Sequence, residues 1–194
     1  MTDLIFEPFP KIPRLKRGCV ISEKVDGSNA QIVFDQYGNV LVGSRKRTIF
    51  PEGTVCQGLS IIKGTDNYGF AGWVQENQAL LFRTLGPGRH YGEWAGLGIQ
   101  RGYKLDHKRF FLFNTHRFGN LPEDALNIGL DVVPVLYAGD FTTTAVDDAM
   151  EDLRVNGSRV DGVSNAEGVI VYHTAAQAYF KVTFDGDRGK WEMP

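Results

Sequence analysis

The sequence predicts an α+β fold with mainly antiparallel sheets. Short strand-like runs are separated by glycine-containing turns, and two stretches carry apolar residues at helical spacing. Strands and helices do not alternate in the regular way that a parallel sheet requires. The chain has 194 residues, of which 42% are hydrophobic. This length favours a single domain over residues 1–194 that buries its own core.

The first half predicts a β meander followed by a loop and a helix. The strands are 19–25, 30–34 and 40–44, separated by the turns Asp26-Gly27-Ser28 and Tyr37-Gly38-Asn39. Residues 45–65 show no sustained period, so we expect a loop there, with room for a short helical piece. From a cap at Asp66 or Asn67, apolar residues follow helical spacing until Gly86-Pro87-Gly88, which predicts one helix.

The second half predicts five more strands and two helices. The strands are 89–95, 109–114, 132–137, 167–172 and 178–184. A short helix is expected after Pro122, and a longer one runs from about Thr144 to a stop at Asn156-Gly157.

Composition limits the cellular setting more than it limits the chemistry. The formal net charge of -2 does not indicate a nucleic-acid-binding protein, although a local basic face is compatible with it. Cys19 and Cys56 form no CxxC pair, so neither a disulfide framework nor a cysteine zinc site is supported. The N-terminus lacks the apolar core of a signal peptide, and no apolar run is long enough to span a bilayer. We therefore expect a cytoplasmic protein without a membrane partner.

The stretch ISEKVDGSN, residues 21–29, places Lys24 directly before a glycine turn. A lysine amine that loses its proton can form a covalent bond to phosphorus or to a carbonyl carbon. The alternative is a surface lysine paired with Glu23 or Asp26, because a motif as short as KxDG recurs by chance.

Five further motifs give this lysine a context. EKVDGSN resembles the nucleotidyl-lysine motif of the covalent nucleotidyltransferase superfamily, which comprises polynucleotide ligases and mRNA capping enzymes, and its GSN ending resembles the RNA ligase branch. The stretches similar to the superfamily's later motifs follow in order: GSRKR (43–47), YGEWAG (91–96), FFLFN (110–114), EGVIVY (167–172) and YFKVTF (179–184). Together they span Lys24 to Lys181, and the chain resembles the catalytic domain of a minimal phage-type, ATP-dependent RNA ligase.

This resemblance implies a fold and a set of site residues. The fold is the nucleotidyltransferase (ATP-grasp-like) ligase catalytic fold, with two mainly antiparallel β-sheets and flanking helices. The implied catalytic residues are Lys24, Glu167 and Lys181, and the implied ATP-binding residues are Glu23, Asn29, Arg45, Glu93, Phe113 and Lys181. Glu167 is also the implied ligand for Mg²⁺ or Mn²⁺, which prefer oxygen donors.

Several of these residues have an implied contact and an ordinary structural alternative. Arg45 would contact phosphate, with Arg47 as its substitute, or it lies on a solvated hairpin end. Glu93 would bind the ribose hydroxyls, and its aromatic neighbours Tyr91 and Trp94 make a solvated carboxylate less favoured. Phe113 would stack on the purine.

The aromatic choice stays open, because Phe111 shares a strand face with Phe113 and an aromatic on a strand is usually core. Glu167 is otherwise a polar strand end, and Asn29 is otherwise an amide that stabilises the turn. Lys181 stands between apolar neighbours on its strand, so its charge needs an anion, which the resemblance supplies as the α-phosphate.

The last motif departs from the family's common pattern of two lysines separated by one residue. The flanking positions on the same strand face are Tyr179 and Thr183. Either one phosphate contact is missing, or Lys190 or Arg188 replaces it.

The resemblance implies an RNA-repair ligase that forms lysyl-AMP at Lys24, transfers AMP to a 5'-phosphate end and seals that end to a 3'-hydroxyl. RNA is the expected partner, and DNA remains an alternative. Only about a dozen residues follow the last motif, so we expect no separate C-terminal OB domain, and an accessory protein could capture substrate. Three alternative functions stay open: a minimal DNA ligase, a capping-type guanylyltransferase, and a non-catalytic nucleotide- or RNA-end-binding module. Basic residues available for phosphate are Lys11, Arg14, Lys16, Arg17, Arg45, Lys46, Arg47, Arg101, Lys104, Lys108 and Arg109.

Overall fold

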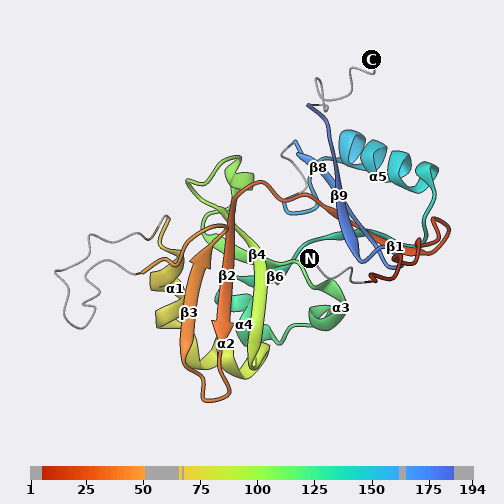
Figure 1. Cartoon of the computed structure of the whole chain (residues 1–194). Coiled ribbons are helices and arrows are strands. Elements are labelled where there is room, and N and C mark those ends of the chain that lie inside the picture. Colours follow the sequence, from red (N-terminus) through yellow and green to blue (C-terminus); the bar gives the residue numbers. More distant parts are fainter. Residues whose placement is uncertain (1–5, 51–65, 67, 162–164, 186–194) are drawn as a thin grey trace.

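The computed structural model describes residues 6–50, 66, 68–161 and 165–185, and its strands form two sheets (Figure 1). One sheet has four strands in the order β7-β1-β8-β9, and the other has five in the order β3-β2-β4-β5-β6. The strands are β1 (Gly18–Glu23), β2 (Ser28–Phe34), β3 (Val40–Ser44), β4 (Gly88–Gly96), β5 (Lys108–Leu112), β6 (Leu130–Val132), β7 (Val135–Asp140), β8 (Gly168–His173) and β9 (Ala178–Thr183). The helices are α1 (Phe70–Glu76), α2 (Gln78–Leu85), α3 (Thr115–Phe118), α4 (Glu123–Asn127) and α5 (Thr143–Asn156), with a 3₁₀ turn at Gly102–Lys104.

Every pairing between the named strands is antiparallel except that of β5 with β6, which confirms the expected α+β class with mainly antiparallel sheets. None of the described helices is long and apolar enough to cross a membrane.

Each sheet buries one face against its own helices. Alternate residues of β2, such as Ile32 and Phe34, join a core with apolar residues of α1, α2 and α4. In the other sheet, Ile21 of β1 and Val171 of β8 pack with Leu153 of α5. These two cores hold the helices on one side of each sheet and leave the opposite sides for other contacts.

The expected meander at the N-terminus is wrong in one respect. β2 and β3 form the expected hairpin, but β1 pairs with β7 and β8 and not with β2. The turn after Lys24 therefore carries the chain from one sheet to the other. The single strand expected over 132–137 is wrong for the same reason, because β6 and β7 belong to different sheets and the chain crosses between them at Val133 and Pro134.

The helix expected from Asp66 to Leu85 is two helices. Asn77 has φ -109° and ψ 13°, outside helical values, so it ends α1 and begins α2. Asp66 does cap the helix start, but from a distance, since its carboxylate accepts hydrogen bonds from the backbone N–H groups of Ala71 and Gly72. Periodicity did not reveal the break, because apolar residues keep facing the sheet on both sides of it.

Other expected elements are confirmed close to their predicted bounds. The helix after Pro122 is α4, and the helix near Thr144 is α5, which Thr142 caps at its start by accepting from the N–H of Ala145. The closing strands are β8 and β9, which pair with each other. Of the expected loop over 45–65, residues 51–65 lie outside the described part of the chain.

A third apolar cluster lies where the chain passes between the sheets. It contains Val25, Ala95, Tyr103, Phe111 and Val133, all at most 4% exposed. Val25 and Val133 are on the two crossing segments, whereas Ala95 and Phe111 belong to the five-stranded sheet. We call this group the joint cluster, and it fixes the position of the segment that carries Lys24.

Candidate active site

Lys24 and Glu167 meet at the ends of two neighbouring strands. Lys24 follows β1 directly, and its backbone N–H donates to the carbonyl of Gly168 at 2.8 Å, which extends the β1–β8 ladder by one residue. Its Nζ lies 2.5 Å from Oε2 of Glu167, and both side chains are about one quarter exposed. The predicted nucleophile and the predicted metal ligand, 143 residues apart, are therefore in contact. The alternative pairing of Lys24 with Glu23 or Asp26 is not formed.

Asp26 is held by two residues of the segment between β4 and β5. Its carboxylate lies 3.1 Å from Nε of Arg101, and its backbone N–H donates to the hydroxyl of Tyr103 at 2.5 Å. Burial raises the pKa of Asp26, and the nearby charge of Glu167 acts in the same direction, while Arg101 opposes both. These contacts hold the turn that carries Lys24.

Glu93 and Asn29 share one face of the five-stranded sheet. The two are directly opposite on β4 and β2, and the Asn29 amide donates to Oε2 of Glu93 at 2.6 Å. Glu93 is only 7% exposed, and burial raises its pKa to about 7 against the opposing effect of the Asn29 hydrogen bond. The carboxylate also accepts a hydrogen bond from the backbone N–H of Gly27, and its remaining lone pairs can accept from another donor, such as a sugar hydroxyl.

The two candidate aromatics differ in their surroundings. Phe111 is directly opposite Glu93 across the β4–β5 ladder, but it is 2% exposed and packs in the joint cluster. Phe113 follows the end of β5, and it is 38% exposed. Of the two rings, Phe113 has the accessible surface that stacking on a base requires.

Arg45 lies beside a surface pocket of about 480 Å³ whose lining also includes Asn29, Glu93, Lys46 and Arg47. All three basic side chains are exposed, and among the described residues none of them has an acidic partner. The basic turn of motif GSRKR is thus brought to the Asn29–Glu93 pair, with its charge available for an anion.

Glu23 is placed differently from what the resemblance implied. Its side chain is fully buried, and it accepts hydrogen bonds from the Ser158 hydroxyl at 2.5 Å and the Arg159 backbone N–H at 2.7 Å. Burial raises its pKa, against the effect of these two donors. In this arrangement Glu23 anchors the end of β1 to the segment after α5 and does not face the Lys24 side of the sheet.

Lys181 lies on β9, at the edge of the four-stranded sheet. It is in register with Ile170 of β8, which in turn is opposite Ser22 of β1, so Lys181 and Ser22 are on the same face of the sheet. Lys24 lies two residues after Ser22 along the chain and therefore shares this face. Lys181 is exposed and has no acidic partner among the described residues. Lys190 and Arg188, the suggested replacements for a second lysine, lie outside the described part of the chain.

The metal candidate is a lone carboxylate. Within the described ranges, no group of three or more His, Cys, Asp or Glu side chains could enclose a metal ion. Mg²⁺ commonly takes one or two protein carboxylates together with substrate phosphates and water, so Glu167 beside Lys24 fits an ion that enters with a nucleotide.

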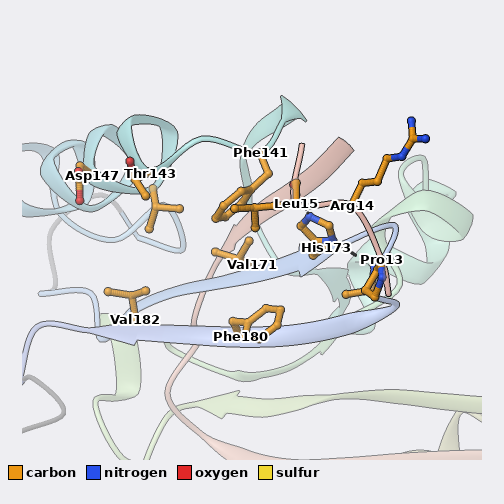
Figure 2. Close-up of a pocket in the computed structure, with 12 residues that line it drawn as sticks. Pro13, Arg14, Leu15, Phe141, Thr143, Asp147, Val171, His173, Phe180 and Val182 are labelled. Atoms are coloured by element: carbon orange, nitrogen blue, oxygen red, sulfur yellow. Dashed lines mark hydrogen bonds between the residues drawn. The ribbon is translucent and has the colours of Figure 1, made fainter. Parts of the chain in front are cut away.

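A mostly apolar cavity lies elsewhere in the described part of the chain (Figure 2). It has a volume of about 480 Å³ and lies between α5, β8, β9 and the N-terminal arm, with Val171, Phe180 and Val182 in its lining. These side chains are on the α5 face of the sheet, whereas Lys24 and Lys181 are on the other. This pocket is therefore separate from the candidate active site.

Sequence reasoning missed Tyr103 and Ser158, and it named Arg101 only as a basic residue available for phosphate, not as the ion-pair partner of Asp26. Tyr103 and Arg101 belong to the connection between β4 and β5, which is longer than a hairpin loop and contains three non-glycine residues with positive φ: Gln100, Tyr103 and Lys104. The length of that connection is a signal of a functional loop. Ser158 carries no comparable signal. The buried Glu23 needs hydrogen-bond donors, but the sequence does not show which residues supply them.

Known proteins share this fold and these motifs. Residues 17–191 match the family model described as RNA ligase. The fold matches solved structures of Naegleria gruberi RNA ligase: a mutant with AMP and Mn (18% identity, TM-score 0.58), an apo mutant (17%, 0.57) and the enzyme with PPi (17%, 0.56). Each match covers 87% of this chain and 50% of the other, so the chain spans about half the length of these structures.

Comparison with curated proteins finds no match. The family match covers most of the chain and includes every motif from Lys24 to Lys181, so the protein belongs to the RNA ligase family.

Proposed function

We propose that this chain is an ATP-dependent RNA ligase that carries AMP on Lys24. The observation that supports it most is the contact of Lys24 Nζ with Glu167 at 2.5 Å, with the Asn29–Glu93 pair close by at the crossing between the sheets. Lys24 and Glu167, from two separated family motifs, are in contact. The Asn29–Glu93 pair, from EKVDGSN and YGEWAG, lies near enough for the Lys24 charge to act on the pKa of Glu93.

The reaction consists of three displacements at phosphorus. Lys24 Nζ, once it has given up a proton, attacks the α-phosphorus of ATP, a P–N bond forms and pyrophosphate leaves. The AMP then passes to the 5'-phosphate of an RNA end, which releases Lys24. Finally, a 3'-hydroxyl attacks that 5'-phosphorus, and AMP leaves as the strands join. Such reactions depend on positioning and on neutralising phosphate charge.

The chain's own residues have distinct roles in this proposal. Asn29 and Glu93 bind the ribose, the exposed ring of Phe113 stacks on the adenine, and Arg45 and Lys181 contact phosphates. Glu167 orients the Lys24 amine and can hold its proton through their short contact. Glu23 supports β1 from its buried position and makes no nucleotide contact.

ATP and a divalent metal are the proposed cofactors. Naegleria gruberi RNA ligase structures of the same fold contain ATP or AMP with Mn, which supports both for this chain. A bound Mg²⁺ or Mn²⁺ ion would take Glu167 as a ligand and neutralise charge on the departing phosphates. The cytoplasmic location, the phage-like RNA-repair setting and the accessory protein stay predictions.

The deciding experiment is self-labelling without nucleic acid. Incubation with α-labelled ATP and Mg²⁺ should attach label to the wild-type chain, and the label should be lost on acid treatment, as a phosphoramide bond requires. Lys24→Ala should carry no label, with folding checked by circular dichroism. Label from GTP alone would indicate a capping-type enzyme. A folded wild type that takes no label from either nucleotide would overturn the lysyl-nucleotide mechanism and favour a binding module.

Acceptor choice is the second part of the test. The labelled protein, freed of ATP, should transfer AMP to RNA with a 5'-phosphate end faster than to the equivalent DNA. Faster transfer to DNA would instead identify a minimal DNA ligase.

A further inference from the structure

The described helices α1, α2 and α4 pack on one face of the five-stranded sheet, and the opposite face, which we call the uncovered face, carries none of them, although the joint cluster packs on its end near Val25. In Figure 1 the strands β3, β2 and β4 lie in front of α1, α2 and α4, and the uncovered face is turned toward the viewer. Asn29 and Glu93 belong to this face, at the end nearest to Lys24. The face therefore continues directly from the candidate nucleotide site.

Two rows of side chains follow Asn29 and Glu93 along the uncovered face. Register places Gln31 of β2 opposite Tyr91 of β4, and Phe113 adjoins Tyr91 because its N–H donates to the Tyr91 carbonyl at 3.0 Å. The next row consists of Leu41, Val33 and Arg89. We call these six residues the open sheet face.

The open sheet face exposes apolar and aromatic surface. Tyr91 is 53% exposed, Leu41 46% and Phe113 38%. Single exposed apolar residues are ordinary on a protein surface, but adjoining ones on one sheet face commonly mark a binding site.

The charge of this region suits a polyanion. Arg89 is exposed, and its guanidinium donates to the neutral amide oxygen of Gln31 at 2.8 Å, so its charge is not neutralised by that contact. None of the six residues is acidic, and the exposed basic turn of Arg45, Lys46 and Arg47 follows β3 at the end of the sheet near Glu93. Aromatic rings between unpaired basic side chains form the kind of surface that binds single-stranded nucleic acid.

We propose that the open sheet face binds the unpaired RNA strand that leads to the reacting end, with a base stacked on Tyr91 and phosphates near Arg89. The proposal rests on the proposed function and adds a substrate class to it, namely ends in single-stranded RNA. Tyr91 is two residues from Glu93, ~7 Å along the strand, so a base on Tyr91 is close to the nucleotide at Glu93. Only an unpaired base can offer its face to a tyrosine ring, because duplex bases are stacked on each other.

Fluorescence anisotropy with a labelled single-stranded 5'-phosphate RNA and the full chain tests the surface without any chemistry. Tyr91→Ala should weaken binding roughly 5- to 100-fold, as expected for loss of one stacked base, and Tyr91→Trp should restore it. Tyr37→Ala is the matched control, because Tyr37 is 79% exposed but lies on the β2–β3 turn. Arg89→Ala should lower the slope of log affinity against log salt by about 1, whereas Arg83→Ala on α2 should leave it unchanged.

Three outcomes would overturn the proposal. Unchanged single-strand affinity in Tyr91→Ala excludes a stacked base at this position. Equal losses for single-stranded RNA and for a nicked duplex exclude the preference for an unpaired strand. If Tyr91→Ala instead lowers ATP self-labelling as much as RNA affinity, Tyr91 belongs to the nucleotide site. Absent self-labelling in the wild type would contradict the proposed function alone, since the anisotropy result still decides what binds the open sheet face.

Discussion

At the scale of single residues, Glu93 shows how burial alters an ordinary side chain. The carboxylate is 7% exposed, and burial raises its pKa to about 7. Because the pKa in the folded state is higher than in the unfolded chain, the folded protein holds the extra proton more tightly. The stabilisation from this proton is complete below the unfolded pKa and disappears as the pH rises through about 7.

This shift predicts a pH-dependent difference between wild type and Glu93→Gln, whose neutral amide has nearly the same shape. From pH 4 to pH 8, the free energy of unfolding of the wild type should fall relative to the variant by up to about 3 kcal/mol. Urea unfolding at several pH values measures it. Glu76→Gln, at an exposed position on α1, is the control. A difference between wild type and Glu93→Gln that stays constant over this range would show that folding leaves the pKa of Glu93 unchanged.

At the scale of elements, the start of β8 depends on a glycine. Gly168 has φ +150°, and a Cβ there would lie 2.1 Å from the carbonyl oxygen of Val182 on β9. The Gly168 carbonyl also accepts the hydrogen bond from the Lys24 N–H. Close pairing of β8 with β9 and the placement of Lys24 therefore depend on the same residue.

Gly168→Ala should lower the free energy of unfolding by about 2 kcal/mol or more, because backbone strain and a clash with β9 add together. Gly88→Ala is the matched control: Gly88 has φ +127°, but nothing lies within 4 Å of the position that a Cβ would take there. The control should lose only the backbone contribution, about 1 kcal/mol. Equal losses in urea unfolding would show that β9 moves aside at little cost.

At the scale of the whole molecule, the sequence predicted the elements better than their arrangement. Turn residues and alternation located most strands, because both signals are local. The turn residues around Gly27 are compatible both with a hairpin and with a crossing between two sheets. They therefore could not show that β1 and β2 belong to different sheets. Similarly, motif order indicated that Lys24 and Glu167 belong to one site, but the donors that surround Glu23 depend on tertiary packing.

The joint cluster predicts that catalysis depends on the crossing between the sheets more than on either core. Val25→Ala removes two methyl groups next to Lys24, whereas Val74→Ala and Val171→Ala make the same change in the two helix-packed cores. All three should lose about 1–3 kcal/mol of unfolding free energy, because each valine is at most 4% exposed. Only Val25→Ala should also slow lysyl-AMP formation, by roughly 10- to 100-fold, since small displacements of a nucleophile cost that much.

Single-turnover labelling with saturating ATP, at a temperature where all variants are folded, measures the rate. Equal slowing in all three would mean that general stability limits the reaction and that the joint cluster has no special role in placing Lys24.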